Sequence, residues 1–394
     1  MSAETVADHS TPSPRPRANA LAGLRVCHFG TLNPNYIRNQ MTLRMLRRAG
    51  AEVVPIHGSA LRRNPLLAFA ESASLLARAA RQRFGLILVG FPGLVSMPAA
   101  TLLGRLNRAP VVLDALCSQY DHELFDVRSC TAHSPMAKAR FAVEKIAYRL
   151  ADLTLLDTDE RITYVSERFD VPRSLLARIW VGADEAVMYP RPLAPHNALF
   201  TAYFYGTYTH LHGIEHIVEA ARVLRDRGES VRFIVVGSGS TRATIQQRVR
   251  ELGLENLELV EKVPFAELAE GMARSDVCLG VFGTTPTVHR SIPSKIFDAL
   301  AMAKPLITAD ALAVRGAFTY GQHLWLVPPG DGARLAEAIL TLKRDDALRE
   351  RLAREGRRAF VQRFSTDAMV PDLVAALQRV LPARSAPPGP AVSG

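Results

Sequence analysis

The feature that most constrains the fold is an alternation of short apolar runs and helical segments along most of the chain. Leu24–Gly30 is an apolar run that ends in glycine, and Tyr36–Gly50 follows it with apolar residues at helical spacing. Further strand-like runs lie at Glu52–Ile56, Leu86–Val89, Pro110–Leu113, Leu153–Leu156 and Arg178–Val181. Strands that alternate with helices form parallel sheets with helices on both faces. The first half of the chain is therefore predicted to be a doubly wound α/β unit.

The alternation breaks at residues 185–199, which contain Pro190, Pro192 and Pro195, and then restarts. Predicted strands lie at Ala202–Tyr205, Val231–Val236, Leu257–Val260, Val277–Val281, Pro305–Thr308 and Leu324–Val327. Predicted helices lie near residues 211–227, 241–252, 264–273, 294–303, 332–343 and 346–363. The chain is thus predicted to hold two Rossmann-like α/β halves, 23–184 and 200–365, joined by a linker. Because open parallel sheets bind ligands at the carboxyl ends of their strands, we expect a central crevice between the halves.

The ends of the chain differ in composition from the two halves. Residues 1–22 and 383–394 are polar or rich in proline and serine, and we predict disordered tails there. A helix over residues 366–382 is expected to pack back on the first half. The start has no apolar h-region, and no apolar run reaches about 18 residues, so neither a signal peptide nor a transmembrane helix is predicted. The cysteines are scattered without a CxxC pair, which favours a reducing cytosol: Cys27, Cys117, Cys130 and Cys278.

The formal net charge of +10 calls for either solvated arginines or an anionic partner. The anionic partner would be a ligand or a membrane surface. Nucleic acid is disfavoured, because the chain has no zinc-finger, RRM or KH signature and its basic residues are not interleaved with aromatic ones. Residues 61–83 mix apolar side chains with arginines at helical spacing. They suit either core packing with a solvated rim or a basic amphipathic helix on anionic lipid.

Two strand-to-helix loops of the second half contain glycines that would let a ligand approach the backbone. The loop from Gly206 contains Thr207 and His212 and opens onto an amphipathic helix, whose free N–H groups favour an anion. An ordinary turn with a histidine cap is the alternative. The next loop contains Gly237 and Gly239 but lacks the third glycine of the dinucleotide fingerprint, so its signal is weak.

A third loop of the second half gathers charge at a helix start. It places Arg290 and Lys295 near the start and Asp298 about one turn inside the helix. Ser291 or Ser294 can cap this helix, which leaves the cations to meet phosphate and Asp298 to accept from a ribose diol. In the alternative interpretation the cations are solvated and the acid lies favourably near the positive helix end.

These segments resemble a known family. Gly206–Ala220, Ile234–Gly239 and Arg290–Pro305, in that order, are similar to the second half of retaining glycosyltransferases of family four, which have the GT-B fold. Asp276–Gly283 and Ala183–Asp184 also match. The resemblance implies that the second half binds a nucleotide-diphospho-sugar donor and the first half binds the acceptor. It also implies a retaining reaction that needs no metal ion.

The chain departs from that family at several positions. The family's third loop usually has two glutamates, of which the second falls on Asp298 and the first on Arg290. Pro293–Lys295 follows the proline–x–lysine pattern of one branch. His212 stands where a basic residue is usual, and a histidine common after the fourth strand would fall near Leu116. These departures concern the choice of sugar and the catalytic groups.

A DxD sequence, Asp157-Thr158-Asp159, binds manganese in another glycosyltransferase fold. Here it ends a predicted strand and opens a predicted helix, where Thr158 or Asp159 is a natural cap. We therefore predict a helix cap and no metal ligands.

Loops at the carboxyl ends of the strands supply the predicted site residues. The predicted catalytic residues are Arg290, Lys295, Asp121 and His122. The predicted donor-binding residues are Gly206, Thr207, His212, Gly237, Gly239, Ser291, Ile292 and Asp298. The residues predicted to meet the acceptor, as the resemblance implies for the first half, are Asn35, Tyr36, Arg38, Asp114 and Tyr120.

The predicted function is transfer of a sugar from a nucleotide-diphospho-sugar to a glycan, lipid-linked or small-molecule acceptor, with no cofactor beyond the donor. The predicted location is the cytoplasm, with peripheral contact to the inner face of an anionic membrane as a variant. A sugar-nucleotide epimerase of the same fold is one alternative, although the cationic Arg290 fits leaving-group stabilisation better. A non-catalytic protein that binds nucleotide sugars is the other.

Overall fold

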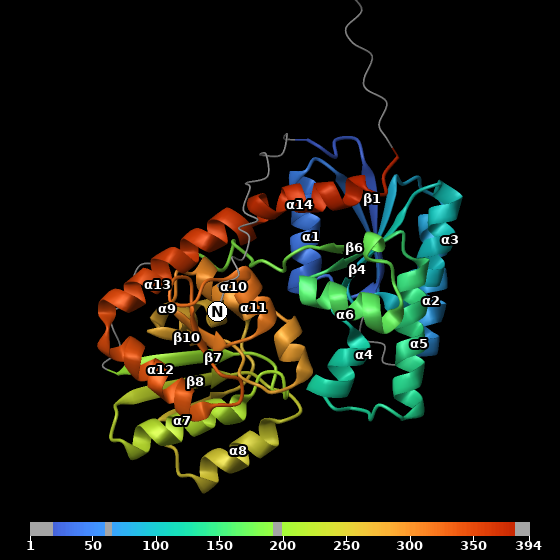
Figure 1. The fold of residues 1–394 in the computed structure, drawn as a ribbon. Helices are drawn as coiled ribbons and strands as arrows, with labels where there is room; N and C mark the ends of the chain where they lie inside the picture. Colours follow the sequence, from blue (N-terminus) through green and yellow to red (C-terminus); the bar gives the residue numbers. More distant parts are fainter. Residues whose placement is uncertain (1–18, 60–64, 192–198, 383–394) are drawn as a thin grey trace, which may run out of the picture.

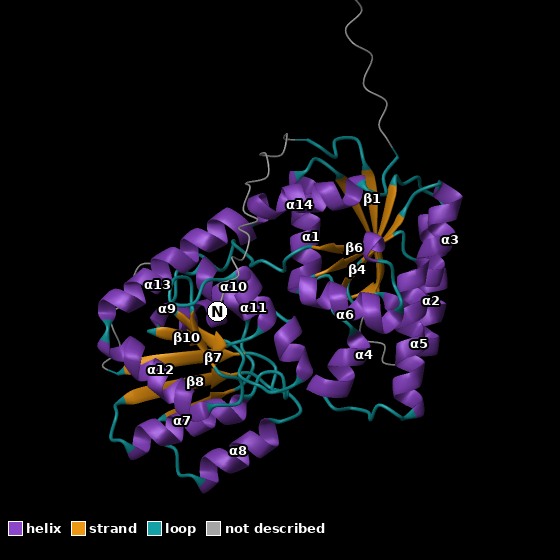
Figure 2. Cartoon of the chain, in the orientation of Figure 1, coloured by secondary structure: helices purple, strands orange, loops and turns teal. Residues whose placement is uncertain are grey.

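The computed structural model describes residues 19–59, 65–191 and 199–382, which form two six-stranded parallel sheets (Figures 1 and 2). The first sheet has the order β2 (Glu52–Ser59), β1 (Arg25–Leu32), β3 (Leu86–Val89), β4 (Val111–Leu116), β5 (Leu153–Leu156) and β6 (Leu176–Arg178). The second has the order β12 (Trp325–Val327), β11 (Leu306–Ala309), β10 (Val277–Leu279), β7 (Phe200–Tyr205), β8 (Val231–Val236) and β9 (Leu257–Val260). The strand order reverses between β1 and β3 and between β7 and β10. Ligands of doubly wound sheets bind at such switch points.

Helices cover both faces of each sheet. Those of the first half are α1 (Ile37–Arg48), α2 (Pro65–Ala79), α3 (Met97–Asn107), α4 (Gln119–Asp121), α5 (Pro135–Leu150) and α6 (Asp159–Phe169). Those that follow are α7 (Ile214–Asp226), α8 (Arg242–Glu251), α9 (Phe265–Arg274), α10 (Ser294–Ala301), α11 (Leu312–Ala317), α12 (Gly332–Arg344), α13 (Asp346–Ala359) and α14 (Thr366–Gln378). In Figure 1, α2, α3 and α5 lie on the side of the first sheet away from the second half.

Local chemistry accounts for several of these helix starts. Ser134, Thr158, Asp331 and Ser365 each accept a backbone N–H three residues ahead, which satisfies one free donor at a helix start. The central strands are fully buried apolar runs, as is typical of parallel sheets covered on both sides. The α/β prediction with two doubly wound units is confirmed.

Three local predictions differ from the structure. The last strand of the first sheet ends at Arg178, and the apolar residues Trp180 and Val181 instead pack beside the C-terminal segment, where the Trp180 ring lies 5.6 Å from Phe364. Helix α11 was not predicted. Leu21, assigned to a tail, is buried, and its N–H donates to the carbonyl of Ala49. The remaining tail residues, 1–18 and 383–394, lie outside the described residues.

The chain crosses back to its first half at its end, where α14 lies along α1 (Figure 1). The Glu185 carboxylate accepts from the N–H and hydroxyl of Thr366, both at 2.8 Å, and Arg379 donates to the carbonyl of Leu176 at 2.9 Å. Within the predicted linker, residues 192–198 lie outside the described part of the chain. Among the described residues, no helix is both long and apolar enough to cross a bilayer.

Candidate functional site

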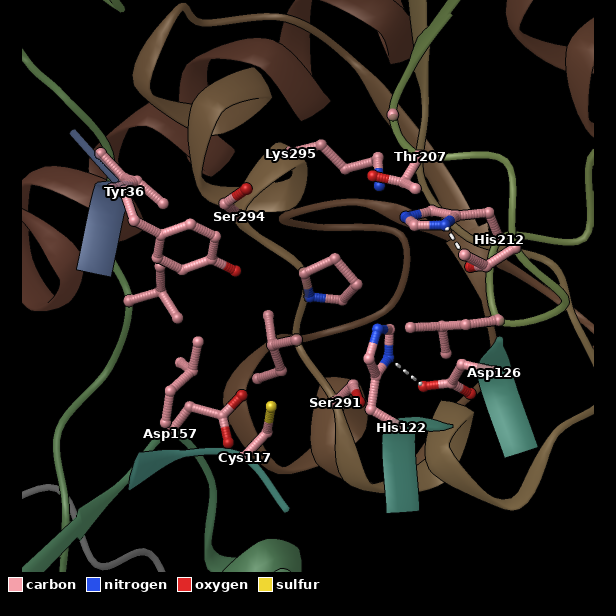
Figure 3. A pocket seen from close by; sticks show the side chains of 18 of the residues that line it. Tyr36, Cys117, His122, Asp126, Asp157, Thr207, His212, Ser291, Ser294 and Lys295 are labelled. Carbon is pink, nitrogen blue, oxygen red and sulfur yellow. Dashed lines mark hydrogen bonds and ion pairs between the residues drawn. The ribbon is translucent and has the colours of Figure 1, made fainter. Parts of the chain in front are cut away.

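A pocket of about 500 Å³ lies between the two halves, where the loops of both switch points meet. Tyr36 follows β1 and Phe91 follows β3, whereas Gly206 and Thr207 follow β7. In Figure 3, Lys295, Thr207 and His212 gather on one side of the pocket. Cys117, His122, Asp126 and Asp157 of the first half lie below them in this view, together with Ser291 of the second half. The predicted crevice therefore exists, with a cationic side and a side that carries acids.

Lys295 is the central cation of the pocket. It lies in the first turn of α10, its side chain is buried, and its ammonium is 5.3 Å from the ring centre of Phe204. Burial lowers the pKa of Lys295 to about 7, while the nearby Asp298 opposes this shift. A desolvated ammonium beside the positive end of a helix favours a bound anion strongly. The structure thus places Lys295 where the sequence predicted it.

Asp298 lies behind Lys295 and does not line the pocket. It is 1% exposed, and one of its carboxylate oxygens accepts the hydroxyl of Tyr205. Burial raises the pKa of Asp298 to about 7, although the hydroxyl and Lys295 both oppose the shift. Direct contact with a ribose, as predicted, does not fit this burial. Asp298 instead holds the hydroxyl of Tyr205, which lines the pocket, and its charge acts on Lys295.

The loop after β7 supplies neutral donors beside Lys295. His212 Nδ1 lies 2.9 Å from the Thr209 hydroxyl, and burial together with the charge of Lys295 holds the pKa of His212 well below its usual value. A neutral imidazole whose Nδ1 accepts the hydroxyl carries its proton on Nε2 and can donate to an anion there. His212 and Thr207 therefore complement Lys295 without adding charge.

Gly237 and Gly239 support this loop and do not line the pocket. A Cβ on Gly237 would lie 1.9 Å from the carbonyl oxygen of Gly206, and one on Gly239 would lie 2.5 Å from that of Tyr208. Gly237 also has φ of +139°, a conformation that side chains rarely adopt. Their predicted contact with the donor is replaced by a packing role, because they let two loops approach each other.

His122 and Asp126 form a hydrogen-bonded pair on the opposite side of the pocket. His122 Nδ1 lies 3.1 Å from Asp126 Oδ2, and both residues line the pocket. Because a carboxylate oxygen accepts, Nδ1 donates to it, and the neutral form of the imidazole then carries its lone pair on Nε2. The segment is anchored from α5, where the buried Glu144 accepts the N–H of Tyr120 at 2.8 Å and burial raises the pKa of Glu144 to about 7. His122 is thus available as a base.

The DxD segment holds an ion pair. Thr158 caps α6, as predicted, and Arg161 Nε lies 2.8 Å from Asp157 Oδ1. Both members of the pair line the pocket, and burial raises the pKa of Asp157 to about 6. Among the described residues, no group of three or more His, Cys, Asp or Glu could hold a metal ion. The sequence missed Arg161, whose i, i+4 spacing from Asp157 on a predicted helix was a usable signal.

Arg290 lies at the interface between the halves and does not line the pocket. Its guanidinium is 2.6 Å from the carboxylate of Asp121, which is fully buried, and 4.2 Å from the ring centre of Tyr164. Its carbonyl accepts the Thr158 hydroxyl at 2.7 Å. The predicted catalytic roles of Arg290 and Asp121 do not fit this arrangement, in which each neutralises the other.

Asp126 makes a second connection between the halves. Its carboxylate accepts the hydroxyls of Thr285 and Thr287, and its carbonyl accepts the N–H of His210 at 3.1 Å. With the Arg290–Asp121 pair it forms an interdomain clasp beside the pocket. The sequence did not single out Asp126, because the threonines that donate to its carboxylate, Thr285 and Thr287, lie 159 and 161 residues away.

The residues predicted to meet an acceptor divide into two groups. Tyr36 is partly exposed on the pocket wall, and Asn35 beside it is exposed but not part of the lining. Arg38 and Asp114 form a fully buried ion pair at 2.7 Å, and Tyr120 is buried among aromatic rings. Acceptor contact by these three does not fit their burial. These three residues pack inside the first half, where Arg38 also donates to the carbonyl of Trp180 at 3.0 Å.

Ser291 and Ile292 do line the pocket, as predicted. Ser291 donates to the carbonyl of Thr287 at 2.7 Å and accepts from Arg161. Cys117 also lines the pocket, but burial raises its pKa to about 12, so its thiol stays protonated at neutral pH. Five of the twelve predicted donor-binding and catalytic residues, namely Asp298, Gly237, Gly239, Arg290 and Asp121, do not line the pocket. The other seven do: Gly206, Thr207, His212, Ser291, Ile292, Lys295 and His122.

Two facing parallel sheets with strand-end loops around a shared pocket define the GT-B class. Solved GT-B structures agree: HepE of Anabaena in complex with UDP and glucose superposes with a TM-score of 0.67 over 90% of this chain and 99% of that one, at 16% identity. Sucrose-phosphate synthase of Thermosynechococcus elongatus gives 0.68 over 90% and 98%, at 17% identity.

Residues 200–345 match the family model of glycosyl transferases group 1, so the second half of the chain is similar to the domain that this model describes. The chain is 23% identical to an alpha-D-kanosaminyltransferase of Streptomyces kanamyceticus over 64% of its own length and 66% of that protein. It is 27% identical to a phosphatidyl-myo-inositol mannosyltransferase of Mycobacterium leprae over 60% of each. The matches thus span less than two thirds of these relatives.

Proposed function

We propose that the protein transfers a sugar from a nucleotide-diphospho-sugar to an acceptor hydroxyl, and that it does so with retention and without a metal ion. The proposal rests on Lys295, whose buried ammonium lies on the pocket wall at the start of α10. Thr207 and His212 offer hydrogen-bond donors beside it. This arrangement suits a diphosphate, because its negative charge would lie next to both the ammonium and the positive end of the α10 dipole. The group 1 domain supports the same conclusion.

The chemistry asks little of the protein beyond orientation and charge stabilisation. The bond from the anomeric carbon to the diphosphate oxygen breaks, and its electron pair leaves with the diphosphate. A bond forms from the acceptor oxygen to the anomeric carbon, and the acceptor proton passes to the departing diphosphate oxygen. Lys295, His212 and the start of α10 stabilise the departing charge, which is the job a metal ion would otherwise do.

The acceptor would enter from the side of the first half, past Tyr36 and His122. Candidate acceptors are glycans, lipid-linked glycans and small polar molecules, since the relatives include enzymes named for each kind of product. His122 Nε2 offers an alternative destination for the acceptor proton. His122→Gln separates the two routes: a fall in kcat of about a hundredfold or more indicates a protein base, and a small fall indicates the leaving diphosphate.

The test starts from UDP-sugars, because HepE was solved with UDP, with UDP and glucose, and with UDP-glucose. A thermal-shift panel finds the donor, since a ligand at about a hundred times its Kd stabilises the native state by roughly 2.7 kcal/mol. Transfer to an acceptor panel, or UDP release in the presence of EDTA, then tests activity. Isomerised nucleotide sugar in the absence of acceptor would instead show an epimerase. Tight UDP binding with neither reaction would show a binding protein.

A location in the cytoplasm, with contact to the inner face of a membrane, belongs to the same proposal. It rests on the net charge and on the four scattered, unpaired cysteines. Fractionation of cells that express the chain would test it, with recovery in a carbonate-washable membrane fraction expected for peripheral contact.

A further inference from the structure

The outer face of the first half carries apolar side chains that no part of residues 19–59, 65–191 and 199–382 covers. Helix α5 buries Ala137, Ala147 and Tyr148 on its inner side. Its outer side exposes Met136, Val143 and Ile146, which are 53%, 41% and 54% exposed. Positions separated by three, four or seven residues share one side of a helix, so the exposed residues form a stripe.

The neighbouring helix extends this stripe. Helix α3 packs against α5, and Leu102 and Leu106 are exposed one turn apart on α3. Together with the α5 stripe they form the outer apolar patch, defined as Leu102, Leu106, Met136, Val143 and Ile146. These are five of the twelve large apolar residues exposed among the described residues. Such clustering is typical of a contact surface, because isolated exposed apolar residues are otherwise scattered.

Cations outnumber the exposed acids around the outer apolar patch. Its two helices and the residue after α3 carry six basic residues, namely Arg105, Arg108, Lys138, Arg140, Lys145 and Arg149. The one acid on these helices, Glu144, is buried and holds backbone N–H groups. Arg140 pairs with Glu123 at 2.9 Å, and Arg149 lies 3.6 Å from Asp170. A net positive rim therefore remains.

A groove offers three of these cations to one ligand. It has a volume of about 890 Å³ and lies between the ends of α3 and α5. Its charged lining is Arg105, Arg108 and Arg149 with one acid, Asp152, which accepts the N–H of Val111 at 2.7 Å. Arginine forks match the geometry of phosphate oxygens. An apolar patch beside a groove of arginines matches the two ends of a phospholipid, an acyl chain and a phosphate headgroup.

We propose that this face, the outer apolar patch with the arginine groove, docks on a bilayer that contains anionic phospholipid. The apolar side chains enter the acyl boundary and the cations hold headgroup phosphates. A second copy of the chain is disfavoured as the occupant, because two such faces would bring like charges together. Helix α2, within the segment that the sequence suggested for lipid contact, exposes chiefly small and basic residues such as Ala73, Ala77 and Arg78.

The inference can fail while the proposed transferase activity stands, because it concerns a surface outside the pocket. Sedimentation of the full chain with vesicles tests it, using phosphatidylcholine with and without phosphatidylglycerol. Binding is expected only with the anionic lipid and should weaken with added salt. Equal binding to both vesicles, or no binding at low salt, would overturn the proposal.

Two variants and matched controls locate the surface. Replacing Arg105, Arg108 and Arg149 with Gln should weaken binding about a hundredfold, at about fivefold for each cation. The pair Leu106→Glu and Ile146→Glu should abolish it. The controls change the same residue types in the second part of the chain: Arg351, Arg354 and Arg358 to Gln, and Leu312→Glu with Val361→Glu. Loss of vesicle binding in the control variants contradicts the assignment. Retained vesicle binding in the test variants, with unchanged circular dichroism and Tm, contradicts it as well. Binding to an acidic protein in place of vesicles is a third outcome that would contradict it.

Discussion

The protonation of Lys295 should control the affinity for the donor. Burial lowers its pKa to about 7, whereas a free lysine has a pKa of about 10.4. A diphosphate beside the ammonium stabilises its charged form, so above pH 7 each binding event must take up a proton. From about pH 7 to about pH 9 the protonated fraction falls from about one half to about one in a hundred, so the Kd should rise roughly fiftyfold, or about 2.3 kcal/mol.

Calorimetry with UDP measures this linkage directly. Titrations at about pH 8.5 in buffers of different ionisation enthalpy should show uptake of close to one proton, since the terminal phosphate, with a pKa near 6, is already ionised there. Lys295→Met should bind weakly and without uptake. Uridine, which lacks phosphate, serves as the control ligand and should bind independently of pH. The reasoning is refuted if Lys295→Met keeps the pH dependence of the natural chain.

Asp298→Asn distinguishes a positioning role from contact with ribose. The Asp298 carboxylate raises the pKa of Lys295, so its loss should move the midpoint of UDP binding to lower pH. A contact with ribose would instead weaken UDP and uridine alike at every pH. The two readouts come from one titration series.

Three further predictions concern the surroundings of the pocket. Gly237→Ala should lower the Tm and the UDP affinity together, because its Cβ would meet the carbonyl of Gly206. Gly228, with φ of +70°, has open space, so Gly228→Ala should cost only about 1 kcal/mol, and equal Tm losses in the two variants would contradict this. Arg290→Ala and Asp121→Ala should each destabilise by roughly 3–5 kcal/mol by leaving a buried charge, and in a double-mutant cycle the two losses should not add. Glu144→Ala should cost roughly 1–3 kcal/mol for each backbone N–H left unsatisfied, measured by urea unfolding, and unchanged stability would show that water replaces the carboxylate.

Much of the fold could be predicted because its signals are local. Leu86–Val89, Leu153–Leu156, Val231–Val236 and Leu257–Val260 were bounded correctly, since each is an apolar run between polar turns. Helix α10 begins at Ser294, as expected. The predicted end of β6 was wrong because Trp180 was taken as a strand residue, whereas its apolar ring packs on Phe364 of the C-terminal segment.

The candidate site was predicted less completely, because the burial and pairing of its charged side chains depend on residues that are distant in sequence. Lys295 was found from its position at a helix start. The burial of Asp298 depends on Tyr205, and that of Arg290 on Asp121, which the chain reaches across 93 and 169 residues. No local pattern reports such pairings. Sequence spacing therefore identified the charged groups but not which of them face the ligand.

Arg290 shows what this difference means for the sugar. The resembled family often has an acid there, and an acid at that position could accept hydroxyls of the donor sugar. Here the position holds a cation that is turned to Asp121 and shielded by Tyr164. The carboxylates that line the pocket are instead Asp157 and Asp126, which is paired with His122, and both come from the first half. Asp126 also connects the two halves through Thr285. We therefore expect a change at Asp126 to affect both the pocket lining and the interdomain clasp.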